Sequence, residues 1–175
     1  GQDGANMGAY GIGCIFVPEN EIYIVNTTAL ANDTAWVSVG VSNTDSVSGI
    51  QFDLMYPSDL LYIDSVITNN RLISHDVNVE YIGPELRVLV YNPDLIAIPG
   101  NSGTILKLGF GTPEGLGAYD IQIINPILGN ANIENIITGY DFGSVTLVES
   151  LAPLLTAFDT ITFNEDNSYN ILYDT

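Results

Sequence analysis

Apolar and polar residues alternate with a period of two along most of this chain, and turn-forming residues interrupt the alternation at short intervals. Successive side chains of a β-strand point to opposite faces, so this pattern predicts half-buried strands and argues against helices. The clearest case is the segment AWVSVGV at residues 35–41, which puts three valines on one face and Trp36 on the other. The chain is therefore expected to be all-β.

The same pattern recurs often enough to build a complete sandwich. We expect strands at residues 21–26, 35–41, 50–56, 60–67, 76–82, 85–91, 104–110, 119–124 and 143–148. Gly83-Pro84 reads as the tight turn of a hairpin between two of these strands. In residues 50–56, Gln51, Asp53 and Met55 are expected to face outward. Eight or nine short strands at this spacing predict an antiparallel β-sandwich or jelly roll.

The charge of the chain is strongly negative. Three basic residues stand against 21 acidic ones in 175 residues, which gives a net charge of −18. Such a surface repels phosphate backbones and anionic lipids, so nucleic acid is excluded as a partner and membrane binding is disfavoured. Because 46% of the residues are apolar, the charge does not indicate a disordered chain.

A single cysteine, Cys14, leaves no internal disulfide, so the core must be stable through packing alone. No apolar run has the length of a transmembrane helix. The first seven residues are polar and glycine-rich, unlike a signal peptide, so we expect a mature product or a piece of a larger protein.

Four segments, in this order, resemble the cohesin family: WVSVGVSNTDSVSG, GIQFDLMYPSDLLYIDSV, GTILKLGFGTPEGLGAYDIQI and GSVTLVES. They lie between about residue 22 and residue 148. The resemblance implies a nine-stranded jelly roll, related in shape to some carbohydrate-binding modules, that binds a dockerin through one sheet face. A dockerin is a small helical domain loaded with calcium. Pro57-Ser58-Asp59 departs from the family, which more often has Asp directly after the tyrosine.

The two ends carry other resemblances. GQDGANMGAYG is similar to the last residues of parallel β-helix domains in bacterial surface proteins, and ITFNEDNSYNI is similar to the first strand of bacterial immunoglobulin-like repeats. We therefore divide the chain into an N-terminal extension (1–19), a cohesin-like sandwich (20–149) and a linker with a C-terminal strand segment (150–175). This organisation is typical of a multidomain protein that is secreted or held at the cell surface.

Catalysis has little support in the sequence. The one histidine, His75, stands between Ser74 and Asp76, but the members of a catalytic triad converge from separate elements. We expect His75 in a solvated loop and no enzymatic activity. Calcium is the one candidate cofactor, because Asn164, Glu165, Asp166 and Asn167 offer oxygen ligands in one turn. The alternative is a plain turn, since Asn and Asp favour turns.

Protein binding has the best support. The alternation places Trp36, Met55, Arg87, Leu89 and Tyr91 on the faces opposite the core. If their strands are neighbours, they form one apolar patch with Arg87 as a polar anchor, and such patches mark interfaces. The alternative is that loops or the tails cover this face.

Two further hypotheses stay open. Residues 14–17 or 161–173 offer strands that another copy of the chain would accept at a sheet edge, which would produce a filament. Polysaccharide binding needs exposed aromatic rings at the spacing of sugar rings. Ten tyrosines and Trp36 supply the rings, but no periodic display is visible in the sequence.

Overall fold

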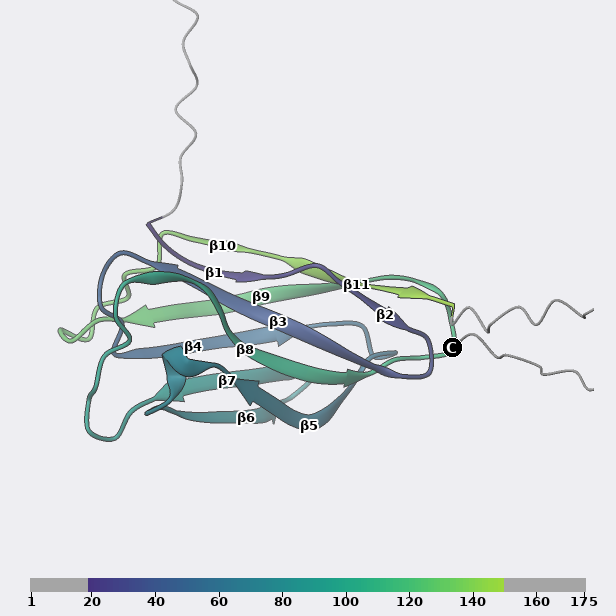
Figure 1. The fold of residues 1–175 in the computed structure, drawn as a ribbon, viewed down its shortest axis with the longest axis horizontal. Helices are drawn as coiled ribbons and strands as arrows, with labels where there is room; N and C mark the ends of the chain where they lie inside the picture. The colour runs from purple at the N-terminus through teal and green to yellow at the C-terminus, as the bar shows by residue number, and fades with distance from the viewer. Residues whose placement is uncertain (1–18, 150–175) are drawn as a thin grey trace, which may run out of the picture.

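Two β-sheets lie face to face in the computed structural model, which describes residues 19–149 (Figure 1). The strands are β1 (Asn20–Ile24), β2 (Thr27–Leu30), β3 (Thr34–Asn43), β4 (Gly49–Met55), β5 (Leu61–Thr68), β6 (Asp76–Ile82), β7 (Glu85–Tyr91), β8 (Asn101–Gly111), β9 (Gly117–Gly129), β10 (Gly139–Asp141) and β11 (Gly143–Val148). The helical structure in these residues is one short 3-10 helix, η1 (Asn70–Leu72). No helix of the described chain is long and apolar enough to span a membrane.

One sheet has the strand order β10-β1-β3-β8-β5, and the other has the order β2-β11-β9-β4-β7-β6. Most neighbours are antiparallel, but β1 pairs with β10 and β2 pairs with β11 in parallel. The predicted antiparallel β-sandwich with a jelly-roll arrangement is confirmed. The predicted boundaries of the tails fall largely on residues 1–18 and 150–175, which lie outside the described residues.

All nine predicted segments form strands, and the hairpin at Gly83-Pro84 is confirmed by the pairing of Ile82 with Glu85. Two short strands, β2 and β10, were missed. The chain leaves one sheet after Ile24 and joins the other at Thr27, and it makes the same passage at Phe142, between β10 and β11. The alternation breaks at both passages. The pattern therefore predicted β1 but not β2, and β11 but not β10.

The core lies between the sheets and follows the predicted alternation. Phe52 of β4 and Phe110 of β8 are its largest buried side chains. The predicted inward sets are buried as expected: Ala35, Val37, Val39 and Val41; Ile50, Phe52 and Leu54; and Leu86, Val88 and Val90. Tyr56 is half-buried and meets Phe110 edge to face, with 4.9 Å between ring centroids.

A β-bulge in β9 changes what faces outward on the six-stranded sheet. The register between β4 and β9 shifts between Gln51 and Asp53, where Asn125 has a positive φ of 50° and Pro126 follows it. Asparagine tolerates this left-handed conformation better than most residues. The bulge reverses the alternation, so Ile121 and Ile123 are buried before it and Leu128 is buried after it, while Ile127 faces solvent.

Gly143 allows the close approach of the two chain passages between the sheets. A Cβ atom built at this position lies 2.5 Å from Ile24 Cγ2 and 2.9 Å from the Ile24 carbonyl oxygen. We expect Gly143→Ala to lower the free energy of unfolding by about 1–3 kcal/mol, measured by urea denaturation, because the backbone of Ile24 must shift. Gly115→Ala is the control, since its Cβ meets only the Tyr119 hydroxyl at 3.5 Å. Equal effects of the two variants would contradict this account.

Candidate functional site

The outer face of the six-stranded sheet brings together four of the five predicted partner-binding residues. β4 and β7 are neighbours, and their register sets Arg87 opposite Asp53, Leu89 opposite Gln51 and Tyr91 opposite Gly49. Met55 lies further along β4, opposite Gln122 of β9. Met55 and Tyr91 are exposed and Arg87 and Leu89 are half-buried, so this face is open to solvent in the described part of the chain.

Trp36 does not belong to this face. It lies on β3 in the other sheet, opposite Gly109 of β8, and it is half-buried. Its grouping with Met55, Leu89 and Tyr91 was wrong. Alternation tells which side of a strand a residue occupies, but it does not tell which sheet the strand joins.

Two isoleucines that were not predicted as site residues enlarge the apolar area at one end of the face. Ile127 lies opposite Gln51 and is 40% exposed, and Ile133 is 95% exposed in the loop that follows β9. Both border a hollow of about 400 Å³, which Gly49 and Gly129 also line. We call Leu89, Tyr91, Ile127 and Ile133 the apolar end. The sequence signal that could have placed Ile127 on the outer face is Asn125-Pro126, where a bulge reverses the alternation.

Ile133 is held in an unusual backbone conformation. Its φ of 64° is left-handed, which is costly for a β-branched residue. Asn130 holds the loop, because its Oδ1 accepts hydrogen bonds from the backbone N–H groups of Asn132 (2.9 Å) and Glu134 (3.0 Å). The loop therefore presents an exposed apolar side chain at a fixed position.

A bidentate ion pair lies at the centre of the same face. Arg87 donates from Nε to Asp53 Oδ1 at 2.7 Å and from Nη2 to Asp53 Oδ2 at 2.9 Å. Asn125, placed by the bulge, donates from Nδ2 to Oδ2 of the same carboxylate at 3.2 Å. The hydrogen bonds from Arg87 hold the pKa of Asp53 below its usual value, against the opposing effect of burial.

Asp53 faces outward as expected, but it is not exposed to solvent. Its side chain points away from the core, yet it is completely buried beneath Arg87 and Asn125. Arg87 is in turn held in one conformation, because its two hydrogen bonds go to a buried carboxylate.

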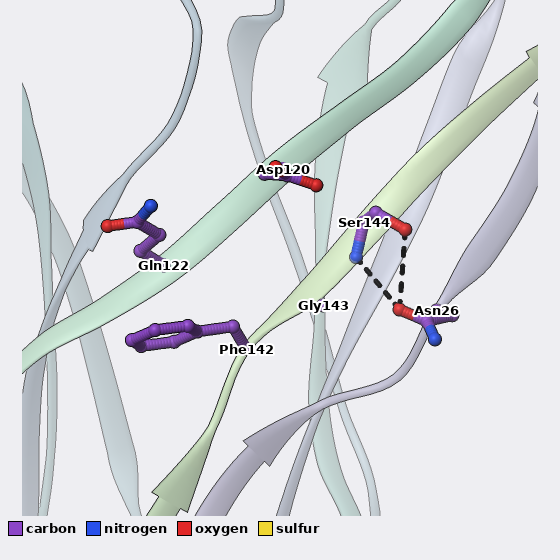
Figure 2. A pocket seen from close by; sticks show the side chains of 6 residues that line it. All are labelled: Asn26, Asp120, Gln122, Phe142, Gly143 and Ser144. Carbon is purple, nitrogen blue, oxygen red and sulfur yellow. Dashed lines mark hydrogen bonds between the residues drawn. The ribbon is translucent and has the colours of Figure 1, made fainter.

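Two further hollows lie at the opposite end of the face from Ile133. One, of about 300 Å³, is lined by Asn26, Asp120, Gln122, Phe142, Gly143 and Ser144 (Figure 2). The other, of about 260 Å³, is lined by Met55, Tyr56, Pro57, Asp120 and Gln122. Only Met55 among these residues was predicted as a site residue, since the others come together through pairings between distant strands.

Comparisons with known proteins find relatives at the level of structure. No family model matches the chain, and no curated protein matches it. The non-cellulosomal cohesin from the archaeon Archaeoglobus fulgidus matches with a TM-score of 0.64 and 16% identity, over 75% of this chain and 92% of that one. The fold is a cohesin fold.

Two other solved cohesins agree with this assignment. The sixth cohesin of scaffoldin B from Acetivibrio cellulolyticus, solved in complex with a mutant dockerin, has a TM-score of 0.62 and 17% identity, over 74% of this chain and 99% of that one. The seventh ScaB type I cohesin from Pseudobacteroides cellulosolvens has a TM-score of 0.60 and 17% identity, over 77% and 95%. The resemblance seen in the sequence is thus confirmed for the fold.

The cohesin fold places His75 in a partly enclosed position. His75 is half-buried after η1, and its Nε2 lies 3.0 Å from the carbonyl oxygen of Ile96. His75 lies in a loop as expected, but it is half-buried and not fully solvated, because Ile96 of the loop after β7 contacts its ring. No hydrogen bond joins His75 to the side chain of Ser74 or Asp76 in the described chain.

The predicted calcium ligands lie in a part of the chain that the structure does not describe. Asn164, Glu165, Asp166 and Asn167 lie outside the described residues, so their role stays a prediction. Within residues 19–149, no three His, Cys, Asp or Glu side chains come close enough together to hold a metal ion.

Proposed function

We propose that this chain is a non-catalytic interaction module that binds a dockerin-like protein through the outer face of the six-stranded sheet. The observation that carries the proposal is the apolar end, which stands beside the Asp53–Arg87 ion pair on one open face. Solved cohesins with the same fold, one of them in complex with a dockerin, support this class of partner. The module is proposed to act outside the cell or at its surface.

The composition of the face suits a protein interface. Binding energy in such interfaces concentrates on a few aromatic, arginine and aliphatic side chains in fixed positions. Arg87 is held by Asp53, and Ile133 is held by the Asn130 loop, so neither loses much freedom on binding. Tyr91, 42% exposed beside Gly49, has open space in which a partner side chain would pack.

The charge around the face defines the partner further. Asp76 pairs with Tyr91 along β6, and Glu80 pairs with Arg87, so carboxylates border the apolar end on one side. The net charge of −18 has the same sign. A partner that presents apolar anchors together with lysine or arginine side chains fits this face, and its association rate should fall as salt is added.

Tyr91→Asp is expected to weaken binding of the partner by roughly 10- to 100-fold, because the charge must be buried where an apolar anchor packs. The partner is captured with the wild-type chain from the culture medium of the source organism, and its Kd is then measured by calorimetry. Ile67→Asp is the matched control, since Ile67 is similarly exposed, at 49%, but lies in the other sheet. The proposal fails if Ile67→Asp abolishes binding while Tyr91→Asp leaves it intact.

The strand-exchange hypothesis stays a prediction. It concerns residues 14–17 and 161–173, which lie outside the described residues, so no observation on residues 19–149 favours it over a protein partner. Light scattering at high protein concentration separates the two, because a filament requires association of the chain with itself.

A further inference from the structure

The two hollows at the end of the face opposite Ile133 form one groove. They share Asp120 and Gln122, which point outward from β9, and they lie on either side of that strand. Phe142 borders the first hollow and Tyr56 borders the second. The groove therefore crosses β11, β9 and β4, with the Phe142 ring near one end and planar polar groups beside it, while the Tyr56 ring packs inward on Phe110.

The polar groups of the groove have hydrogen-bonding capacity to spare. In the described chain, Asp120 and Gln122 have no side-chain hydrogen bond or ion pair, although both side chains carry several bonding sites. Asn26 is oriented by Ser144, whose backbone N–H donates to Asn26 Oδ1 at 3.0 Å and whose hydroxyl lies 3.4 Å away (Figure 2). Because Oδ1 is the acceptor, the Nδ2 group remains as a free donor.

The groove cannot take up a peptide as an added strand. Strand addition needs a free sheet edge. β11, β9 and β4 each have a paired strand on both sides, so their backbone groups are already used in the sheet. Any ligand must be recognised by the side chains alone.

The charge of the groove restricts the ligand further. Asp120 is a carboxylate, and none of the three basic residues lines either hollow. Phosphates, sulfates and acidic sugars are therefore repelled. A neutral ligand with paired hydroxyl groups fits the carboxylate and amide side chains, and its apolar face can stack on the Phe142 ring.

We propose that this groove binds a neutral oligosaccharide of at least two sugar rings. One ring lies over Phe142, which is 50% exposed, with its hydroxyls toward Asn26, Ser144 and Asp120. The next ring crosses Gln122 and reaches the hollow beside Tyr56. The groove is separate from the apolar end, so the module would bind glycan and protein on different parts of one face.

The test is an NMR titration of the isotope-labelled chain with four neutral probes: cellotetraose, xylotetraose, mannotetraose and maltotetraose. At least one should shift the backbone amide signals of Gln122, Phe142 and Ser144 in a saturable way, and tetragalacturonate should not. Phe142→Ala should weaken the binding at least 10-fold with an unchanged fold by circular dichroism.

Tyr91→Asp serves as the control, because it alters the apolar end and leaves the groove intact. It should reduce binding of the protein partner and preserve binding of the oligosaccharide, whereas Phe142→Ala should do the reverse. The proposal is overturned if none of the four probes shifts the groove signals up to roughly 10 mM, ten times a Kd of 1 mM. It is also overturned if the acidic probe shifts them as strongly as a neutral one.

Discussion

The Arg71→Met variant should lose about 3 kcal/mol of the free energy of unfolding, a large share of the stability of a domain this size. Arg71 lies in η1 and its guanidinium group joins the end of β3 to the start of β8. It donates from Nη1 to the carbonyl oxygen of Val41 at 2.8 Å and from Nη2 to Asn43 Oδ1 at 2.6 Å. Longer contacts of 3.3 Å reach the carbonyl oxygens of Gly103 and Asn101.

The effect is large because one planar cation satisfies several acceptors at once. Hydrogen bonds to a charged group contribute more than neutral ones. The Oδ1 atom of Asn43, a residue that is 3% exposed, also loses its donor in a place that water barely reaches. Methionine keeps much of the packing volume, so the variant mainly reports the lost hydrogen bonds.

Urea denaturation measures the loss, and two variants calibrate it. Arg71→Lys keeps the charge but not the planar fork of donors, so it should fall between the wild type and Arg71→Met. Lys107→Met removes the same charge from an exposed position on β8 and should change stability by less than about 0.5 kcal/mol. Comparable losses for Lys107→Met and Arg71→Met would show that net charge, and not the network, is responsible.

The Arg87→Met variant should melt about 10 °C below the wild type at pH 7. It leaves the Asp53 carboxylate, which is 0% exposed in the wild type, with only the amide of Asn125 as a hydrogen-bond partner. Removing one partner of a buried ion pair leaves an uncompensated charge, which destabilises the fold strongly. The loss of stability is therefore larger than for a surface ion pair.

The dependence on pH identifies the cause. In the wild type, Arg87 lowers the pKa of Asp53, so the pair stabilises the fold above about pH 4 and this contribution is lost only as the pH falls through the lowered pKa. In Arg87→Met, burial without a cation should raise the pKa of Asp53 above its unfolded value. Protonation then relieves the penalty, so the gap in melting temperature should narrow as the pH is lowered from 7 toward 4.

A second substitution provides the control. Asp53→Asn in the Arg87→Met background removes the buried charge and should recover part of the melting temperature at pH 7. A gap that stays constant with pH, together with no recovery in the double variant, would mean that Arg87 stabilises by packing and not by pairing with Asp53.

The strands and the core could be predicted from the alternation of apolar and polar residues within each strand. The candidate site could not, because it depends on which strands pair with each other. Val37, Phe52 and Val88 were placed in the core because alternation is a property of one strand at a time. Met55 and Tyr91 were placed on an outer face for the same reason. Trp36 was misplaced because its face belongs to a different sheet, which only long-range pairing decides.

The β9 bulge accounts for much of what sequence reasoning missed. A single extra residue at Asn125 turns Ile127 outward and brings the Asn125 amide over Asp53. The amino-acid composition around Asn125 does not reveal either change. Phe142 was missed because it lies where the chain passes between the sheets, outside every predicted strand. Asn26 was missed because it ends the predicted strand at residues 21–26, whereas the observed strand β1 ends at Ile24.

The parallel pairing of the first and last strands has a mechanical consequence. β1 and β2 run in the same direction as β10 and β11, so Asn20 and Val148 lie at opposite ends of the sandwich (Figure 1). Tension applied at these two points acts along the strands and loads the β1–β10 and β2–β11 hydrogen bonds in shear. These bonds must then give way together and not one by one, so the sandwich should resist force applied along its strands.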